Sequence, residues 1–157
     1  MLRSALSPRE QSTFRMVRDN AKCISISDMG DLVDFAKRYA KAWCSQNPES
    51  VAAFFAERGS ISINNGPPSV GRTAIAREAQ AFMSTFPDMI VTFDKLEPRG
   101  DRTAFHWTLT GTNTGPERTG KRVRISGYEL WKIDKDGLIA ESKGHFDAAE
   151  YDRQLKL

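Results

Sequence analysis

Cysteine and histidine are scarce in this chain of 157 residues, which has two of each. Cys23 and Cys44 are isolated thiols without a C-x-x-C spacing, so they form neither a disulfide framework nor a zinc site. The sequence also lacks a G-x-G-x-x-G run after a strand, a P-loop, an H-E-x-x-H motif and a G-x-S-x-G motif. We therefore expect no catalytic metal, no bound nucleotide and no other cofactor.

Long apolar stretches are also missing. No apolar run approaches the roughly 18–20 residues that a membrane-spanning helix needs, so we expect no membrane partner. The N-terminal residues contain no apolar segment followed by a small-residue cleavage site. We therefore expect no secretory signal and a cytoplasmic location.

An excess of one charge is absent from most of the chain. The first 22 residues hold five basic and two acidic side chains, which accounts for the whole net charge of +3. The other 135 residues carry 18 side chains of each sign. A nucleic-acid-binding domain usually carries its basic patch on a folded face, so we expect no nucleic-acid partner.

The length favours one domain, large enough to bury a core without disulfides. Residues 1–26 are polar and weakly patterned, and we interpret them as an N-terminal extension. We expect the folded domain to span residues 27–157. Within it, residues 28–45 place six apolar side chains at helical spacing, which predicts an amphipathic helix. They are Leu32, Phe35, Ala36, Tyr39, Ala40 and Trp43.

Two further helices are predicted. Asn47 is a suitable N-cap for a short helix over 48–57, with Pro48 at its first position and Gly59 just beyond its end. Residues 72–86 have an apolar side and stop at Pro87, which predicts a third helix.

Strand patterns dominate the second half of the chain. Residues 60–64 form a short predicted strand, and longer ones follow over 89–98, 102–115, 121–134 and 138–146, before a helical tail. Segregated helices and an antiparallel meander indicate an α+β fold. A strongly twisted sheet with helices on one face forms a cone, whose apolar interior is suited to a small hydrophobic ligand.

Three stretches resemble one known family: WTLTGTNTGP, TGKRVRISGYELWKIDKDGLIAES and FDAAEYDRQL. With the order of elements, they are similar to the SnoaL-like, or polyketide cyclase-like, branch of the nuclear transport factor 2-like superfamily. The resemblance runs from about Asp28 to Leu155. It implies a cone-shaped α+β barrel and a cofactor-independent acid/base reaction. Asn113 and Lys143 depart from the pattern, because the branch often has histidine and tryptophan there.

Asp147 is the first candidate catalytic residue, because the resemblance matches it to the acid/base aspartate of the polyketide cyclases. The alternative is that Asp147 only caps the last helix, a position that aspartate favours. His145 lies on the same side of the chain and could orient Asp147 or tune its proton affinity. If the Asp147 carboxylate faces an apolar cavity, burial would favour its use as a base.

Glu129 is the second candidate for catalysis. In the run GYELWK, Glu129 and Trp131 share one face of the strand, while Tyr128 and Leu130 share the other. If the face of Tyr128 and Leu130 packs against other strands, Glu129 lines the cavity beside Trp131. Otherwise Glu129 faces solvent.

Further side chains are candidates for contact with a substrate. His106 and Trp107 alternate on one strand, so one of them faces inward, and the alternation does not decide which. His145, His106 or Tyr128 would be the neutral donor to a developing enolate oxygen. The helix aromatics Trp43, Tyr39 and Phe86 are expected in the core or in the pocket wall, and Asn113 in a turn.

The leading hypothesis is therefore an enzyme that moves a proton next to the carbonyl group of a small hydrophobic compound, as a cyclase or isomerase. The alternative is a binding or dimerising module without chemistry. Hydrolysis of an epoxide ranks lower, because it needs two carboxylates bridged by an arginine, such as Arg102 or Arg124. We also expect a homodimer that forms through alternating apolar residues on the outer face of the sheet.

Overall fold

The computed structural model describes residues 17–19, 22–24, 26–115 and 119–156, with side chains from residue 29 onward. Six strands form one curved sheet in the order β4-β3-β8-β7-β6-β5. The bounds are β3 Phe55–Ile63, β4 Ser69–Val70, β5 Ile90–Arg99, β6 Arg102–Thr112, β7 Arg122–Ile133 and β8 Ile139–Phe146. The four consecutive strands from β5 to β8 pair antiparallel, which confirms the predicted meander.

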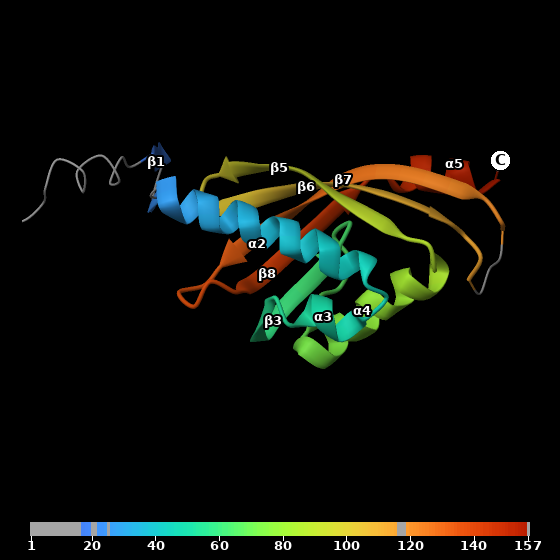
Figure 1. Ribbon diagram of the computed structural model, residues 1–157, viewed down its shortest axis with the longest axis horizontal. Helices are drawn as coiled ribbons and strands as arrows, with labels where there is room; N and C mark the ends of the chain where they lie inside the picture. Colours follow the sequence, from blue (N-terminus) through green and yellow to red (C-terminus); the bar gives the residue numbers. More distant parts are fainter. Residues whose placement is uncertain (1–16, 20–21, 25, 116–118, 157) are drawn as a thin grey trace, which may run out of the picture.

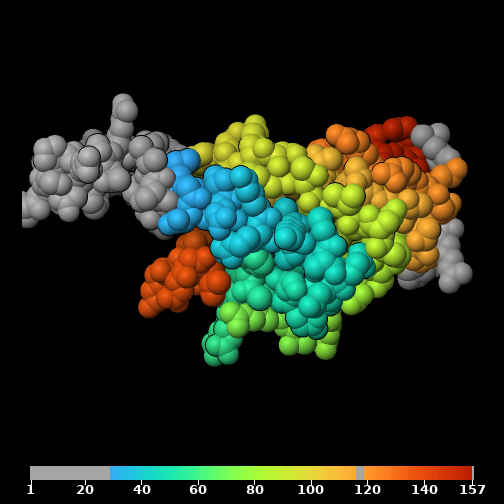
Figure 2. Space-filling view, viewed as in Figure 1, coloured from blue at the N-terminus to red at the C-terminus, as the bar shows by residue number. Residues whose placement is uncertain are grey.

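The helices cover the hollow side of this sheet. α2, Ile26–Cys44, runs along β5, while α3, Pro48–Ala52, and α4, Arg72–Thr85, pack together beside β3 (Figure 1). Figure 2 shows these three helices, coloured from blue to green, across the centre and lower part of the face in view. The result is an unclosed cone of sheet and helices, so the predicted α+β class and cone architecture are confirmed.

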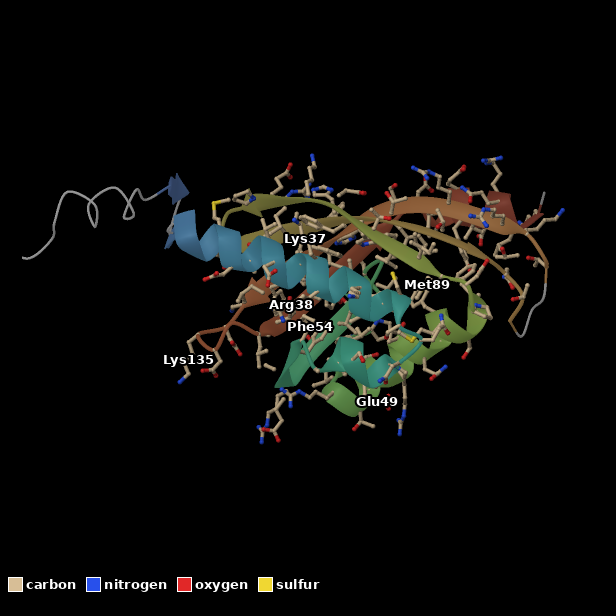
Figure 3. The ribbon with its side chains drawn as sticks, in the orientation of Figure 1. Lys37, Arg38, Glu49, Phe54, Met89 and Lys135 are labelled. Atoms are coloured by element: carbon tan, nitrogen blue, oxygen red, sulfur yellow. The ribbon has the colours of Figure 1, made fainter. Side chains whose placement is uncertain are left out.

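Amphipathic spacing positions α2 as expected. Phe35, Ala36, Tyr39 and Ala40 are buried against the sheet. The opposite face is polar, and Figure 3 shows Lys37 and Arg38 on it. The Arg38 guanidinium lies 5.8 Å from the ring centre of Phe54 and so covers part of that half-buried ring.

The last helix, α5 Ala148–Lys156, packs against β7. Two hydrogen bonds from the side chain of Gln154 hold α5 against β7. Oε1 of Gln154 accepts from the backbone N–H of Arg124 at 2.7 Å, and Nε2 of Gln154 donates to the Arg124 carbonyl at 2.9 Å. Gln154 therefore has a structural role at the end of the chain.

The short second helix differs from its prediction. Asn47 caps it and Pro48 is its first residue, as expected, but it ends at Ala52 and not at residue 57. Residues 55–58 belong to β3 because Phe55 is fully buried and pairs with Ile139. Gly59 lies inside this strand at an irregularity, where a Cβ atom would stand 2.8 Å from the Ile139 carbonyl oxygen.

The sheet is also not antiparallel throughout. β3 pairs parallel with β8, and the two-residue strand β4, which the sequence patterns do not indicate, pairs antiparallel with β3. Two prolines directly before β4 keep it short and at the edge.

The N-terminal region is described in part. β1, Val17–Asp19, and β2, Lys22–Ile24, pair antiparallel as a separate hairpin, and residues 1–16 of the expected extension lie outside the described residues. α2 begins at Ile26, two residues before the predicted start. In the described part of the chain, no helix is long and apolar enough to cross a membrane.

Candidate active site

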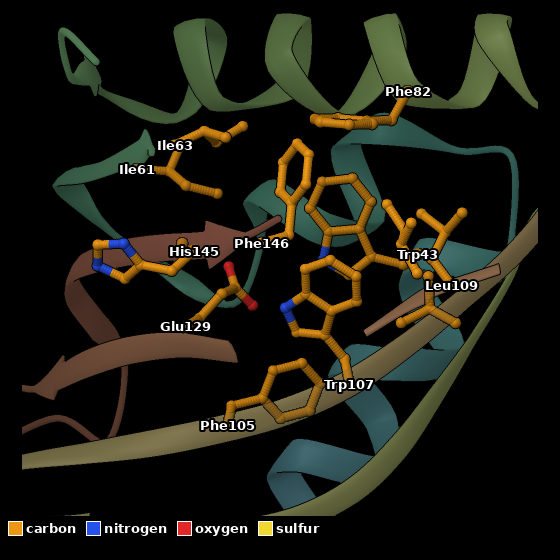
Figure 4. Close-up of a pocket in the computed structure, with 13 residues that line it drawn as sticks. Trp43, Ile61, Ile63, Phe82, Phe105, Trp107, Leu109, Glu129, His145 and Phe146 are labelled. Atoms are coloured by element: carbon orange, nitrogen blue, oxygen red, sulfur yellow. The ribbon is translucent and has the colours of Figure 1, made fainter. Parts of the chain in front are cut away.

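An apolar cavity lies between the hollow face of the sheet and the helices α2 and α4. Its volume is about 70 Å³, which leaves room for a small ligand. Figure 4 shows its wall, in which Glu129 is surrounded by aromatic and aliphatic side chains. The lining residues are Trp43, Ile61, Ile63, Phe82, Val91, Phe105, Trp107, Leu109, Ile125, Glu129, Gly144, His145 and Phe146.

Strand alternation brings Glu129 into this wall. Ile125 and Glu129 lie on the inner face of β7 and line the cavity, while Tyr128 lies on the outer face. The Glu129 residue is 6% exposed, and Figure 4 shows its carboxyl group pointing into the cavity.

Two buried hydroxyl groups hold the Glu129 carboxyl in place. The Tyr39 hydroxyl of α2 donates to Oε1 at 2.9 Å, and the Ser142 hydroxyl of β8 donates to the same oxygen at 3.0 Å. Both of these hydrogen bonds end on Oε1. The indole N–H of Trp131 also favours the charged form of the carboxyl group, although it does not reach hydrogen-bond geometry with any described residue. The second oxygen therefore keeps its lone pairs for a ligand in the cavity.

Burial determines the proton affinity of this group. It raises the pKa of Glu129 to about 7, against an ordinary value of 4.5, because the charged form loses its hydration. The hydrogen bonds from Tyr39 and Ser142 lower the pKa and limit the rise. Glu129 therefore changes its charge near neutral pH, as a group that transfers protons needs to do.

Tyr39 stays a hydrogen-bond donor over the same pH range. Burial and the negative charge of Glu129 raise the Tyr39 pKa well above 10.0. Aromatic contacts also fix its ring, because Tyr39 meets Trp131 and Phe105 edge to face, with centroids 5.2 Å and 5.4 Å apart. Trp131 in turn stacks on Phe105 at 4.8 Å. Tyr39 and Trp131 thus support the site from behind and do not line the cavity.

Asp147 does not have the inward orientation expected if it is a base. It is exposed at the start of α5, where its Oδ1 accepts from the backbone N–H of Glu150 at 3.0 Å. The structure thus gives Asp147 the capping arrangement that was the alternative. His145 lies with it: the side chain pairs across the strands with Tyr128, and Figure 4 shows the imidazole pointing away from the cavity.

The three expected neutral donors lie on the outer face of the sheet. His106, Tyr128 and His145 form a row there, with ring centres 5.7 Å and 5.1 Å apart. His145 borders the cavity, but its imidazole points away from Glu129, and His106 and Tyr128 do not line the cavity. Trp107 is the inward member of the pair that alternation left open. Its indole packs over Gly127, where a Cβ atom would stand 2.6 Å from the ring.

The remaining predicted contact residues divide in two groups. Trp43 lines the cavity and contacts Phe82 edge to face at 6.0 Å. Phe86 and Asn113 are buried but are not among the lining residues. The amide oxygen of Asn113 has no hydrogen-bond partner among the described residues.

The arrangement for opening an epoxide is not present. Arg102 pairs with Glu141 at 3.1 Å, and Arg124 is exposed. Neither guanidinium reaches the Glu129 cavity. Within the described residues, no group of three histidine, cysteine or acidic side chains could hold a metal ion.

Two features of the site were missed in the sequence. Ser142 supplies a buried donor, and Gly144 lies directly opposite Glu129 in the pairing of β7 with β8. The signal for both is their even spacing along β8, but it becomes informative only when the register of β8 against β7 is known.

Comparisons with known proteins agree with this fold. A family model described as SnoaL-like polyketide cyclase matches residues 33–155. No curated protein matches the chain. A hypothetical protein with a ketosteroid isomerase-like fold from Catenulispora acidiphila, in complex with trimethylamine, superposes with a TM-score of 0.69. It is 18% identical, over 79% of this chain and 93% of that chain.

Two other solved structures are similar to the same degree. A candidate polyketide cyclase from Xanthomonas campestris pv. campestris has a TM-score of 0.68 and 20% identity, over 78% of this chain and 95% of that chain. A candidate SnoaL-like polyketide cyclase from Jannaschia sp. CCS1 has a TM-score of 0.71 and 14% identity, over 88% of this chain and 96% of that chain. At these identities the superpositions show a shared fold.

The raised pKa of Glu129 makes the stability of the protein depend on pH. The folded state binds the Glu129 proton more tightly than the unfolded chain does, so proton binding stabilises the folded state. This contribution to stability is complete below pH 4.5 and is lost as the pH rises through about 7. Glu129→Gln removes the titration. We expect its free energy of unfolding to rise relative to the wild type by up to about 3 kcal/mol between those pH values. Urea unfolding at several pH values measures this difference, and a difference that is constant with pH would contradict the burial argument.

Proposed function

Because this chain belongs to the SnoaL-like polyketide cyclase family, we propose that it is a cofactor-independent acid/base enzyme of the cyclase or isomerase type. The proposed substrate is a small hydrophobic carbonyl compound, and the proposed base is Glu129. One observation carries the proposal: a carboxyl group that titrates near neutral pH is buried in an apolar cavity, with one oxygen anchored and the other directed to the ligand space.

The proposed reaction begins with one proton transfer. Oε2 of the Glu129 carboxylate takes a proton from the carbon next to the carbonyl group, so the C–H bond breaks and an O–H bond forms. The electron pair moves to the carbonyl oxygen and gives an enolate. If the enolate is conjugated with a double bond, Glu129 returns the proton to the γ-carbon and completes an isomerisation. If the enolate carbon instead attacks a second carbonyl of the same molecule, a new C–C bond closes the ring, and the alkoxide that forms takes the proton from Glu129.

Each neighbour has a separate part in this step. Tyr39 and Ser142 are positioning residues, because they hold Oε1 by hydrogen bonds and so keep Oε2 directed into the cavity. Water is excluded by the aromatic wall, which strengthens each polar contact inside. The indole N–H of Trp107 is our candidate donor to the enolate oxygen, in place of His145, His106 and Tyr128 on the other face of the sheet.

Hydrogen exchange into 2-tetralone, a flat ketone with acidic hydrogens, tests this role without knowledge of the natural substrate. We expect the protein to accelerate the uptake of deuterium from D₂O, with a rate that rises with pH through about 7, as Glu129 loses its proton. Glu129→Gln keeps the shape of the side chain and removes the base, so it should slow exchange at least ~100-fold. Proton NMR follows the loss of the α-hydrogen signal.

Two further variants complete this test. Asp147→Asn removes a carboxylate outside the cavity and retains a helix cap, so it should leave the exchange rate unchanged. Trp107→Phe keeps a ring over Gly127 but lacks the N–H, and we expect the rate to fall about tenfold or more. Loss of exchange in Asp147→Asn, with exchange retained in Glu129→Gln, would move the base to Asp147. Binding of the ketone without any exchange would favour a binding module without chemistry.

We also propose that two copies of the chain pair through the outer face of the sheet. We expected alternating apolar residues on this face. That expectation is wrong at its centre, where Thr108 and Ser126 lie and hydrogen-bond to each other at 2.8 Å. The support is instead the half-buried row of His106, Tyr128 and His145, with the Arg99 guanidinium 4.6 Å from the Tyr128 ring centre. Aromatic and arginine side chains are enriched at protein interfaces.

Light scattering after size-exclusion chromatography tests the pairing. We expect a particle of twice the chain mass of 17.6 kDa. Tyr128→Glu should convert it to a single chain, because a carboxylate in the centre of the contact would lose its hydration. A wild-type particle of 17.6 kDa at micromolar concentration would contradict the proposal.

A further inference from the structure

Gly144 leaves an opening in the floor of the cavity. In the sheet register it lies between Ile63 of β3 and Glu129 of β7, so the three residues form one row across adjacent strands. A Cβ atom at Gly144 would stand 3.8 Å from Cγ of Glu129 and 3.9 Å from Cγ1 of Ile63. The middle of this row is therefore free space that borders the carboxyl group.

The fold itself does not require a glycine at this position. Gly127 and Gly111 are different: a Cβ atom would collide with the Trp107 ring at the first and lie 3.0 Å from Cβ of Phe86 at the second. The Gly144 distances are ordinary van der Waals contacts, and its backbone is not in the left-handed region. A glycine inside a strand weakens it, and it often marks a place where a ligand comes close to the backbone.

The charges of the residues that line the cavity restrict the charge that a ligand can carry. Among the described residues that line the cavity, no lysine or arginine is present. An anionic ligand would therefore lie beside Glu129 with no cation to balance the two charges in an apolar environment. A cationic ligand would hold Glu129 in its charged form as an ion pair, and the pair would occupy the oxygen that the proposed base needs.

We infer that the substrate is an uncharged carbon acid whose reacting carbon lies over Gly144, and that the absent side chain there sets how large a substituent that carbon can carry. The inference rests on the proposed function of Glu129. It adds the place of the reacting carbon, the charge of the substrate and a residue that determines specificity.

Three ligands of the same size test the charge. 2-Tetralone is neutral, 2-naphthoate is anionic and 2-naphthylmethylammonium is cationic, and quenching of tryptophan fluorescence by each reports binding near Trp43 and Trp107. We expect the ketone to bind at least about tenfold more tightly than the anion at pH values above 7. The cation should bind more tightly as the pH rises, because Glu129 is then charged. Equal or tighter binding of the anion would overturn the neutral class. Binding of the cation that is tighter than that of the ketone below pH 6 as well would overturn it too, and would point to a site for amines.

Substitutions at Gly144 test the position. Gly144→Ala should weaken 2-tetralone binding about tenfold or more, while the melting temperature stays within a few degrees of the wild type. Adding Ile63→Ala to this variant should restore much of the affinity, because it returns space on the opposite side of the opening. Gly30→Ala is the matched control, since a Cβ atom there meets nothing within 4 Å. It should leave the binding unchanged.

The outcomes separate this inference from the function on which it rests. Wild-type affinity and exchange in Gly144→Ala would overturn the inference, even if Glu129→Gln abolishes exchange. Weakened binding in Gly144→Ala, together with normal exchange in Glu129→Gln, would overturn the role of Glu129 alone. No binding of any of the three ligands at millimolar concentration would overturn both.

Discussion

The hydrogen bond from the Tyr39 hydroxyl to the Glu129 carboxyl joins the long helix to the sheet at the bottom of the cavity. The packing around it depends on this contact, because neither partner could be buried alone. An unpaired hydroxyl or carboxyl in an apolar interior costs several kcal/mol. The stacked rings of Phe105 and Trp131 hold the tyrosine in place, and Ser142 supplies a second donor from the opposite side.

In the proposed function, this arrangement lowers the stability of the folded protein and makes Glu129 reactive. A leucine or glutamine in place of Glu129 would remove the cost of burying a group that is charged at neutral pH. The protein instead has hydrogen bonds to one oxygen only, which is enough to hold the group but not to return its pKa to the ordinary range. Partial satisfaction of a buried acid is typical of groups that transfer protons.

Much of the fold could be predicted from local patterns, and the centre of the site only in part. Alternation in the run around Glu129 correctly groups it with Trp131, and helical spacing places Tyr39 on the inner side of α2. However, Tyr39 meets Glu129 across 90 positions of sequence, and that contact follows from how α2 docks on the sheet. The shared side of His145 and Asp147 is likewise visible in the sequence, yet only the register of β8 against β7 shows that it is the outer one. Register and docking are long-range properties, and composition and periodicity do not determine them.

The central claim is that Glu129 is an acid whose pKa burial has moved to neutral pH. Carbon-13 NMR of the protein with labelled glutamate carboxyl groups measures it directly, with the Glu129 signal identified by its loss in Glu129→Gln. The account predicts a titration midpoint of about 7, which moves further upward in Tyr39→Phe because a hydrogen bond to the charged form is lost. A midpoint near 4.5 in the wild type would contradict it.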